Sequence, residues 1–164
     1  MRDIVIIAND IRSTHNVGSL LRTADGFGVS HFYLTGITPY PTIDSDQRLP
    51  HISKKLTNQI KKTALGAENS ISWSHEDNLQ QLLKKLKNDR YTIIGLEQSG
   101  NSIKLNDYQP PTKCALLLGA EVDGIPHDLL NQCDDIVEIA MYGQKESFNV
   151  VQATAIALFV LREA

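Results

Sequence analysis

Short apolar runs alternate with longer amphipathic stretches along the whole chain. Residues 3–8 form a β-branched run typical of a strand covered on both faces, and the apolar residues between Val17 and Phe27 recur at helical spacing. The same criteria predict strands near 31–34, 91–96, 114–118 and 136–139, and helices over 53–65, 77–88, just after Pro126 and over 147–162. Strands that alternate with helices predict an α/β fold, with a mostly parallel sheet and helices on both faces.

The last predicted helix is apolar nearly all round. From Val150 to Leu161, ten of twelve residues are apolar, a length too short to cross a bilayer. Such a helix must be buried on every side, either inside the domain or partly against another subunit. In a chain of this size a partner chain is a reasonable way to cover it, so we expect a homodimer.

Composition indicates one globular domain over residues 1–164. Its 41% apolar content is enough to fill a core. The first ten residues hold only five consecutive apolar positions between Asp3 and Asp10, which predicts neither a signal peptide nor a membrane span. Cys114 and Cys133 are too few for a disulfide framework, and no Cys/His cluster exists. We therefore expect a cytoplasmic protein with two reduced thiols and no bound metal.

Charge is unevenly distributed along the chain. The net charge of −3 argues weakly against a nucleic-acid partner, because phosphate binding draws on Lys and Arg. However, residues 48–62 hold five basic side chains and no acid, whereas residues 115–144 hold six acids and no Lys or Arg. The basic residues are Arg48, Lys54, Lys55, Lys61 and Lys62. They indicate either an RNA-binding surface or a solvated helix face, and both interpretations stay open at this point.

Three segments combine glycines with polar side chains where strands end or helices begin, which is where open α/β sheets place their ligands. They are residues 16–28, 118–126 and 139–150. No segment of the chain contains a phosphate loop of the G-x-x-x-x-G-K-[ST] type or a G-x-S-x-G nucleophile elbow. Gly26 and Gly28 end a helix where a dinucleotide fingerprint would begin one. These classes of site are therefore disfavoured.

The middle segment, residues 118–126, has the features expected of a ligand pocket. Gly119 directly follows a buried strand, which lets a ligand approach the backbone, and Gly124 with Pro126 fixes a turn. Such a pocket suits a flat or adenosine-like ligand.

In this order and spacing, the three segments resemble the three signature motifs of the SpoU branch of the SPOUT RNA methyltransferases. The motifs are N-x-G-x-x-x-R-T-A-x-x-F-G, G-x-E-x-x-G-[IL] and I-P-M-x-G-x-x-x-S-L-N-V, and the resemblance runs from Asn16 to Val150. It implies a carboxyl-terminal trefoil knot, a rare exception to the rule against threaded chains. It also implies S-adenosylmethionine as methyl donor and a ribose 2′-hydroxyl of RNA as acceptor, with tRNA the first candidate and rRNA the second.

The resemblance also implies roles for individual residues. The catalytic and RNA-phosphate site would contain Asn16 and Arg22, supported by Glu121, Ser147 and Asn149. Positions that hold the methyl donor correspond to Leu96, Gly119, Ile139, Met141 and Phe148. Two residues depart from the motifs, because Ala140 replaces the proline of I-P-M and Phe148 replaces the leucine of S-L-N. Neither change removes a polar group, so we expect only the shape of the donor pocket to differ.

The chemistry of methyl transfer to a ribose hydroxyl favours a role for an arginine. A ribose hydroxyl is a poor nucleophile while a sulfonium methyl is already activated, so the enzyme must align the two and favour an alkoxide-like oxygen. Arg22 can bind a phosphate bidentately and stabilise developing negative charge. Because a guanidinium is almost always protonated, it is a doubtful general base. The electrostatic role is favoured, and the role of base stays open.

Taken singly, these residues have ordinary structural explanations. Arg22 would be a surface arginine, Glu121 a capping or ion-paired carboxylate and Ser147 a helix cap. For the whole chain, one alternative is a non-catalytic RNA-binding or assembly factor, which the presence of Arg22, Glu121 and Asn149 disfavours. The other is a base methyltransferase of the same superfamily, which the N-x-G-x-x-x-R and S-x-N patterns disfavour. We therefore predict an RNA 2′-O-ribose methyltransferase.

Overall fold

One seven-stranded sheet forms the centre of the computed structural model, which describes residues 1–164. The strands are β1 (Asp3–Asn9), β2 (His31–Thr35), β3 (Trp73–Glu76), β4 (Thr92–Leu96), β5 (Ile103–Lys104), β6 (Lys113–Leu118) and β7 (Asp135–Glu138). They lie in the order β3-β2-β1-β6-β4-β7-β5, and every neighbouring pair is parallel. The α/β class is confirmed, and the sheet predicted to be mostly parallel is parallel throughout.

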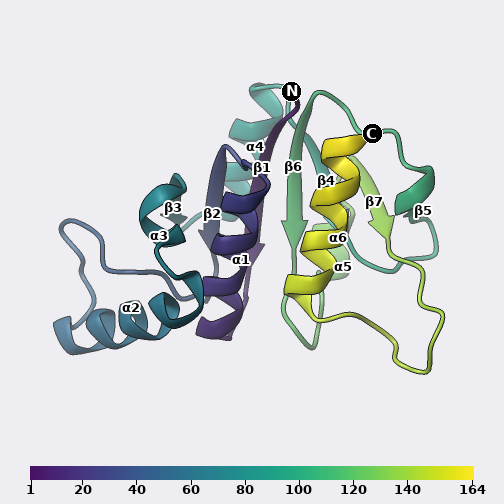
Figure 1. The fold of residues 1–164 in the computed structure, drawn as a ribbon. Helices are drawn as coiled ribbons and strands as arrows, with labels where there is room; N and C mark the ends of the chain where they lie inside the picture. Colours follow the sequence, from purple (N-terminus) through teal and green to yellow (C-terminus); the bar gives the residue numbers. More distant parts are fainter.

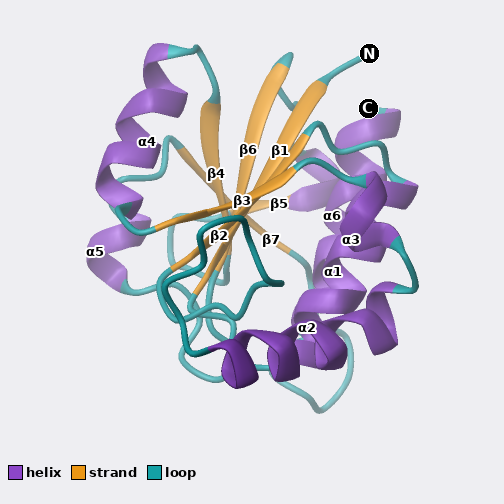
Figure 2. Ribbon diagram, turned by 90° about the vertical axis from the view of Figure 1, so that its left-hand side faces the viewer, coloured by secondary structure: helices purple, strands orange, loops and turns teal.

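Helices cover both faces of this sheet. They are α1 (Thr14–Gly26), α2 (Pro50–Ala64), α3 (Ala67–Ser70), α4 (Leu79–Asn88), α5 (His127–Leu130) and α6 (Val150–Glu163), with a 3₁₀ turn η1 at Leu105–Asp107. One face carries α1, α3 and α6, and the other carries α4 and α5 (Figure 1, Figure 2). Helix α2 extends beyond the sheet next to α1 (Figure 1). None of the helices has the length and apolar character needed to cross a membrane.

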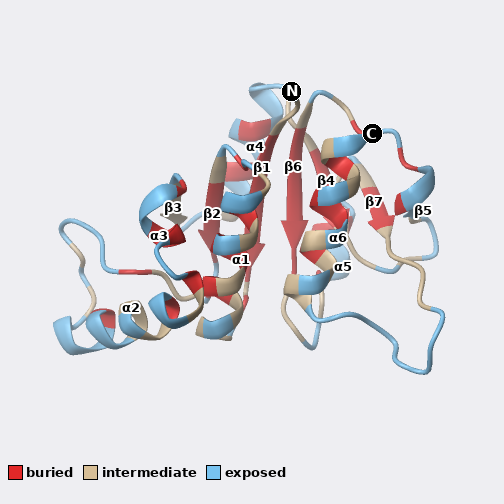
Figure 3. Cartoon of the chain, viewed as in Figure 1, coloured by how far each residue is buried: buried red, intermediate tan, exposed pale blue.

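The pleat of the sheet divides the core into two layers. On β1, Ile4 and Ile6 belong to the layer that also contains buried residues of α1 and α6. The alternating residues Val5 and Ile7 belong to the layer under α4 and α5. Successive side chains of a strand point to opposite faces, so a strand covered on both sides must be apolar at every position. The buried sheet in Figure 3 is the result.

The sequence pattern does not predict the two edge strands β3 and β5. Strand β3 reads WSHE and is only partly buried, whereas β5 is two exposed residues long. Neither carries the apolar run by which buried strands are recognised, because an edge strand is covered on fewer sides. Their positions are set by pairing with β2 and β7.

The last helix differs from its prediction in two ways. It begins at Val150 instead of Ser147, because the side chain of Asn149 caps it by accepting from the backbone N–H of Val151 at 2.8 Å. The expectation of burial on every side is not met within one chain, since Ile156 is 37% exposed and Phe159 is 59% exposed. Part of the apolar surface of α6 therefore faces outward.

Helices α1 and α2 approach each other closely at Gly18. A Cβ atom at this position would overlap the Thr63 hydroxyl and the carbonyl oxygen of Ile60. The Thr63 hydroxyl also donates to the carbonyl of His15 at 2.9 Å, so side chain and backbone are both used in this contact. The glycine of the N-x-G motif is therefore a packing requirement of the fold.

We expect Gly18→Ala to lower the free energy of unfolding by about 1–3 kcal/mol, because the added methyl forces the two helices apart. The matched control is Gly26→Ala on the same helix, where an added Cβ meets no atom within 4 Å. Urea unfolding of both variants measures the difference. Equal stability of the two variants would show that the contact at Gly18 can relax without cost.

Candidate functional site

Four adjacent strands end at the same edge of the sheet, and the loops that follow them form the candidate site. Strands β1, β6, β4 and β7 are neighbours in that order. Because they are parallel, their carboxyl ends lie together, where open α/β sheets bind ligands. The loops after β6, β4 and β7 line a cavity of about 140 Å³. Its lining includes Leu96, Gly119, Ile139, Met141 and Phe148, the five residues that the motif resemblance places at the methyl donor.

A tight turn after β6 forms one wall of this cavity. Ala120 and Gly124 exchange backbone hydrogen bonds at 3.0 and 3.1 Å, and Gly124 has a positive φ of 67°. A Cβ on Gly119 would overlap the backbone of Gly124 and Ile125. The two glycines of the second motif are therefore needed for the turn itself: Gly119 for close approach and Gly124 for its backbone angle.

The Glu121 carboxylate joins this turn to the start of α1. It accepts hydrogen bonds from the backbone N–H groups of Arg12 at 3.0 Å and Ser13 at 3.0 Å, and from the side-chain amide of Asn16 at 3.0 Å. Burial raises the pKa of Glu121, but these hydrogen bonds outweigh burial and hold the pKa below its ordinary value. Glu121 is therefore ionised near neutral pH and committed to holding the backbone.

Asn16 and Asn149 extend the connection to α6. The Asn149 side chain donates to Oδ1 of Asn16 at 3.4 Å and accepts from the backbone N–H of Val151. Ser13 caps α1 by accepting from the backbone N–H of Asn16. The amide orientations of both asparagines are thus fixed by their neighbours, and the starts of α1 and α6 are placed side by side.

Ser147 also lies in this region. It lines the cavity on the loop between β7 and α6, where residues 142–149 are exposed. The Gln98 side chain holds this loop by donating to the carbonyl of Glu146 at 2.7 Å. The structure thus brings Asn16, Glu121, Ser147 and Asn149 to one end of the sheet.

Arg22 lies elsewhere. Its exposed side chain borders a separate hollow. The hollow is also lined by Ser19 of α1, Phe27 directly after α1, Thr63 of α2, and Val151 and Ala155 of α6. The first turn of α6 separates the two regions, because Val150 and Ala153 line the cavity while Val151 and Ala155 line the hollow. Within one chain, the structure does not bring Arg22 into the cavity.

The predicted basic surface lies mainly on α2. Lys54, Lys55, Lys61 and Lys62 are all exposed, and none of them takes part in an ion pair. Lys54 and Lys61 are seven residues apart, as are Lys55 and Lys62, so each pair shares a side of the helix. Four uncompensated positive charges therefore project from one helix that extends beyond the sheet (Figure 1).

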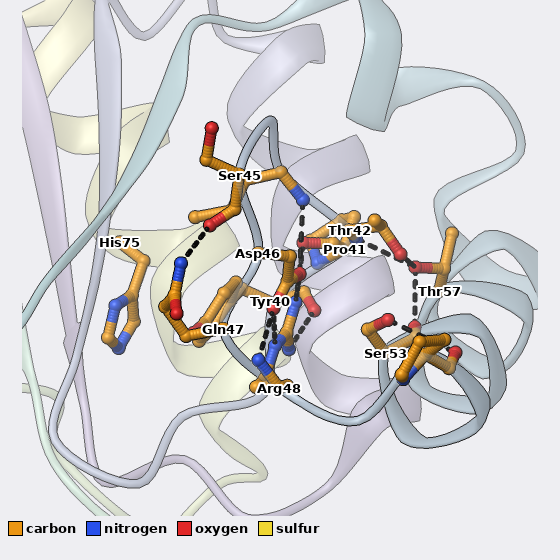
Figure 4. Close-up of polar contacts among 12 residues, drawn as sticks. Tyr40, Pro41, Thr42, Ser45, Asp46, Gln47, Arg48, Ser53, Thr57 and His75 are labelled. Atoms are coloured by element: carbon orange, nitrogen blue, oxygen red, sulfur yellow. Dashed lines mark hydrogen bonds and ion pairs between the residues drawn. The ribbon is translucent and has the colours of Figure 1, made fainter.

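Arg48 differs from these lysines, because its charge is partnered within its own loop. Its guanidinium donates to Asp46 at 2.9 Å and to the carbonyls of Tyr40 and Pro41 at 2.9 and 3.1 Å (Figure 4). It also lies 3.6 Å from the ring centroid of Tyr40. The hydrogen bond from Arg48 lowers the pKa of Asp46 well below its ordinary value. Arg48 thus fastens the loop before α2, and its charge is compensated. The presence of Asp46 two residues earlier in the sequence is the feature from which this ion pair could have been predicted.

Sequence reasoning missed two acidic residues of the cavity, Glu97 and Glu138. Each directly follows or ends a strand that the sequence pattern does predict, β4 and β7. The motifs do not include these two residues. Only their position at a strand end could have indicated from the sequence that they belong to the cavity. No group of three or more His, Cys, Asp or Glu side chains in the structure is arranged to hold a metal ion.

Comparisons with known proteins show the family and the fold of this chain. The model of the SpoU rRNA Methylase family matches residues 3–159. The chain is 31% identical over 157 residues to a tRNA (guanosine(18)-2′-O)-methyltransferase of Saccharomyces cerevisiae, which covers 94% of this chain and 10% of that protein. It is 30% identical over 158 residues to the 23S rRNA (guanosine-2′-O-)-methyltransferase RlmB of Salmonella typhi, covering 96% of this chain and 59% of that protein.

The fold is that of solved methyltransferases. The structure resembles an AdoMet-bound rRNA methyltransferase from Sinorhizobium meliloti with a TM-score of 0.83 at 21% identity, over 98% of this chain and 56% of that one. The chain therefore spans 10% of the length of the yeast relative and 59% of the length of the Salmonella relative.

The lowered pKa of Glu121 predicts a pH-dependent contribution to stability. Because the folded-state pKa lies below the ordinary value of 4.5, the contribution is present above that pH and is lost as the pH falls through the folded-state pKa. We expect Glu121→Gln to lower the free energy of unfolding near neutral pH by about 1 kcal/mol or more, and we expect this deficit to shrink in acid. Urea unfolding at several pH values measures it.

The control is Asp123→Asn on the same turn, whose ion pair with Arg12 is exposed on both sides. Exposed pairs contribute little, so this variant should match the parent protein at every pH. A deficit for Glu121→Gln that is the same at neutral and acid pH would contradict the assigned role.

Proposed function

Because this chain belongs to the SpoU rRNA methylase family, we propose that it is an RNA 2′-O-ribose methyltransferase that uses S-adenosylmethionine. Structured RNA is the acceptor, with tRNA as the first candidate and rRNA as the second. The observation that carries the proposal is the shared cavity: it unites the five donor residues Leu96, Gly119, Ile139, Met141 and Phe148 with Glu121 and Ser147. The names of the yeast and Salmonella relatives support both candidate acceptors.

The cavity suits this methyl donor. Its walls are apolar where Leu96, Ile139 and Phe148 contribute, and its charged residues are all acids. The tight turn that contains Gly119, Ala120 and Gly124 forms part of the cavity wall. When bound, S-adenosylmethionine supplies an activated methyl group on a positively charged sulfur. The apolar residues would hold the adenosine portion, and main-chain groups beside Gly119 and Ile139 would give it polar partners.

In this proposal, Glu121 orients Asn16, and Asn16 and Asn149 present their amides to the RNA. Asn16 donates one amide hydrogen to Glu121 and Asn149 donates one to Asn16, so each amide retains a second N–H for the RNA. Glu121 already accepts from several donors and is ionised, so it orients Asn16 instead of taking a proton. Ser147 offers a hydroxyl at the cavity wall, where it can bind the ribose or the donor.

The position of Arg22 is best explained by a homodimer. Phe159 and Ile156 of α6 are exposed, and the hollow beside Arg22 is lined by Val151 and Ala155 of the same helix. A second copy packed on this surface in a two-fold symmetric interface would cover the apolar residues. It would also bring the partner subunit's Arg22 to the cavity, which lacks a cation of its own.

Arg22 then acts electrostatically. Its guanidinium binds an RNA phosphate and stabilises the negative charge that develops on the 2′-oxygen, while the hydroxyl proton passes to water. The lysines of α2 bind further phosphates, and they provide a surface that tracks the RNA backbone.

Three further features belong to the same proposal. Residues 1–164 form a single domain, because both core layers share one sheet. The carboxyl-terminal segment forms a trefoil knot, as the motif resemblance implies. The protein works in the cytoplasm, a reducing compartment in which the free thiols Cys114 and Cys133 persist.

We expect Arg22→Ala to lower methyl transfer by about 100-fold or more, because one electrostatic partner of the reacting oxygen is lost. Donor affinity should stay within about twofold, because the groups that Arg22 is proposed to contact are the RNA phosphate and the 2′-oxygen and not the donor. Transfer of labelled methyl to tRNA and rRNA, followed by digestion to nucleosides, gives both the rate and the site on the ribose. Full turnover by Arg22→Ala, or a methyl found on a base, would falsify this assignment.

Mixing two inactive variants tests the dimer. Arg22→Ala lacks the arginine and Asn149→Ala lacks the amide. If the arginine acts across the interface, a mixed dimer contains one complete site, and a one-to-one mixture should regain about a quarter of the parent activity. No recovery after subunit exchange would place Arg22 and Asn149 in the same subunit's site.

We expect joint replacement of Lys54, Lys55, Lys61 and Lys62 by Ala to weaken RNA binding and to flatten its dependence on salt. Each lost phosphate contact lowers the slope of log affinity against log salt by about 0.7–0.9. The control is replacement of Lys84 and Lys85, which are exposed on α4 across the sheet. Binding that is unchanged, or weakened equally by the control, would exclude the α2 surface.

A further inference from the structure

Within its own chain, the cavity carries negative charge without a counter-ion. Three of its lining residues are glutamates, Glu97, Glu121 and Glu138, and none is Lys, Arg or His. Of the four ion pairs in the structure, none includes these residues. Glu121 is committed to the backbone of the loop before α1. Glu97 and Glu138 are therefore the residues whose charge needs an explanation.

These two glutamates lie at the ends of paired strands. Leu96 of β4 is in register with Val137 of β7, so Glu97 and Glu138 follow at the next position of the ladder. The backbone N–H of Glu97 donates to the carbonyl of Val137 at 3.0 Å, which keeps the two chains together at this point. Like charges on neighbouring strands repel each other, so a cation bound in the cavity would be attracted by both.

Neutral donors hold both carboxylates in place. Glu97 accepts from the backbone N–H groups of Gln98 at 2.9 Å and Ile125 at 3.0 Å. Glu138 accepts from the hydroxyl of Ser102 at 2.7 Å. These donors are neutral, so they orient the two carboxylates without adding a positive charge beside them. The cavity is thus built to keep two fixed negative charges beside apolar walls.

The chemistry of the walls indicates which cation fits. Metal ions need several ligands grouped around one point, and the acidic residues of the chain are not grouped in that way. Leu96, Ile139 and Phe148 instead offer apolar surface next to the carboxylates. An organic ligand with an apolar body and one positive charge satisfies both features.

We propose that Glu97 and Glu138 determine specificity for the charge of the methyl donor: they make the cavity prefer a sulfonium over the neutral thioether that remains after transfer. The inference rests on the proposed function and goes beyond it, because neither residue belongs to the signature motifs. S-adenosylmethionine and S-adenosylhomocysteine differ by one methyl and one positive charge. Their relative affinity therefore measures how strongly the cavity responds to that charge.

This preference has a consequence for turnover. The attraction between the glutamates and the ligand disappears when the sulfur becomes neutral, so the thioether is released more readily than the sulfonium. The same carboxylates are not bonded to any basic residue that could move with the RNA. Charge selection is therefore a property of the cavity before RNA binds, and it can be measured in the protein alone.

Calorimetric titration of the purified protein tests the proposal without any activity measurement. The ligands are S-adenosylmethionine, S-adenosylhomocysteine and sinefungin, which carries an amine in place of the sulfonium methyl. The variants are Glu97→Gln, Glu138→Gln and the double replacement, each checked by thermal unfolding. The control is Glu146→Gln, which removes one exposed charge from the neighbouring loop and does not line the cavity.

We expect the parent protein to bind both cationic ligands more tightly than S-adenosylhomocysteine. Each single replacement should reduce that preference by about threefold and the double replacement by about tenfold, through weaker binding of the cations. Affinity for S-adenosylhomocysteine should stay within about twofold. Added salt should reduce the preference of the parent protein and leave the double variant nearly unchanged. Glu146→Gln should behave as the parent protein does.

Other outcomes distinguish failure of charge selection by the glutamates from failure of the proposed function. A folded double variant with an unchanged preference overturns charge selection and leaves the donor site intact. Equal weakening of all three ligands also overturns it, because the glutamates would then hold a part that the ligands share. Failure of the parent protein to bind any of the three overturns the proposed function itself.

Discussion

The hydrogen bonds of the Glu121 carboxylate are the interaction on which the site depends. They tie the turn after β6 to the loop between β1 and α1, and through Asn16 they reach the cap of α6 at Asn149. This connection exists because β1 and β6 are parallel neighbours, with Ala8 in register with Leu118, so that their following loops lie at the same edge. Three motifs that are far apart in sequence thereby become one structure. An ionised carboxylate suits this task, since it accepts several N–H groups at once.

Helix α6 links this structure to the proposed dimer. Its cap belongs to the Asn16 network, one side of its first turn lines the cavity, and the other side borders the hollow beside Arg22. Farther along, Ile156 and Phe159 expose apolar surface. A partner that covers this surface and supplies an arginine would act directly on the element that carries Asn149. Assembly and catalysis are therefore coupled through a single helix in the proposed enzyme.

The two proposed ligands have opposite charges, and the surfaces proposed to bind them are oppositely charged as well. The cavity is lined by acids, which suits a small cationic donor, while α2 carries four uncompensated lysines, which suit a polyanion. The small net charge of −3 conceals this separation. Because the two surfaces are on different elements, α2 can bind RNA phosphates while the cavity binds the cationic donor.

The sequence by itself determined the α/β class, the main strands and helices, and the motifs of the site, because these depend on local periodicity and on residue types at fixed spacing. It did not determine the edge strands β3 and β5, which exist only through pairing with β2 and β7. Tertiary structure also decided that Asp46 compensates Arg48 and that Arg22 faces away from the cavity. Likewise, only the register of β4 and β7 places Glu97 beside Glu138. Spacing along a chain specifies which residues share a helix or strand. Which partners surround a side chain, and whether its charge is compensated, depend on segments that folding brings next to it.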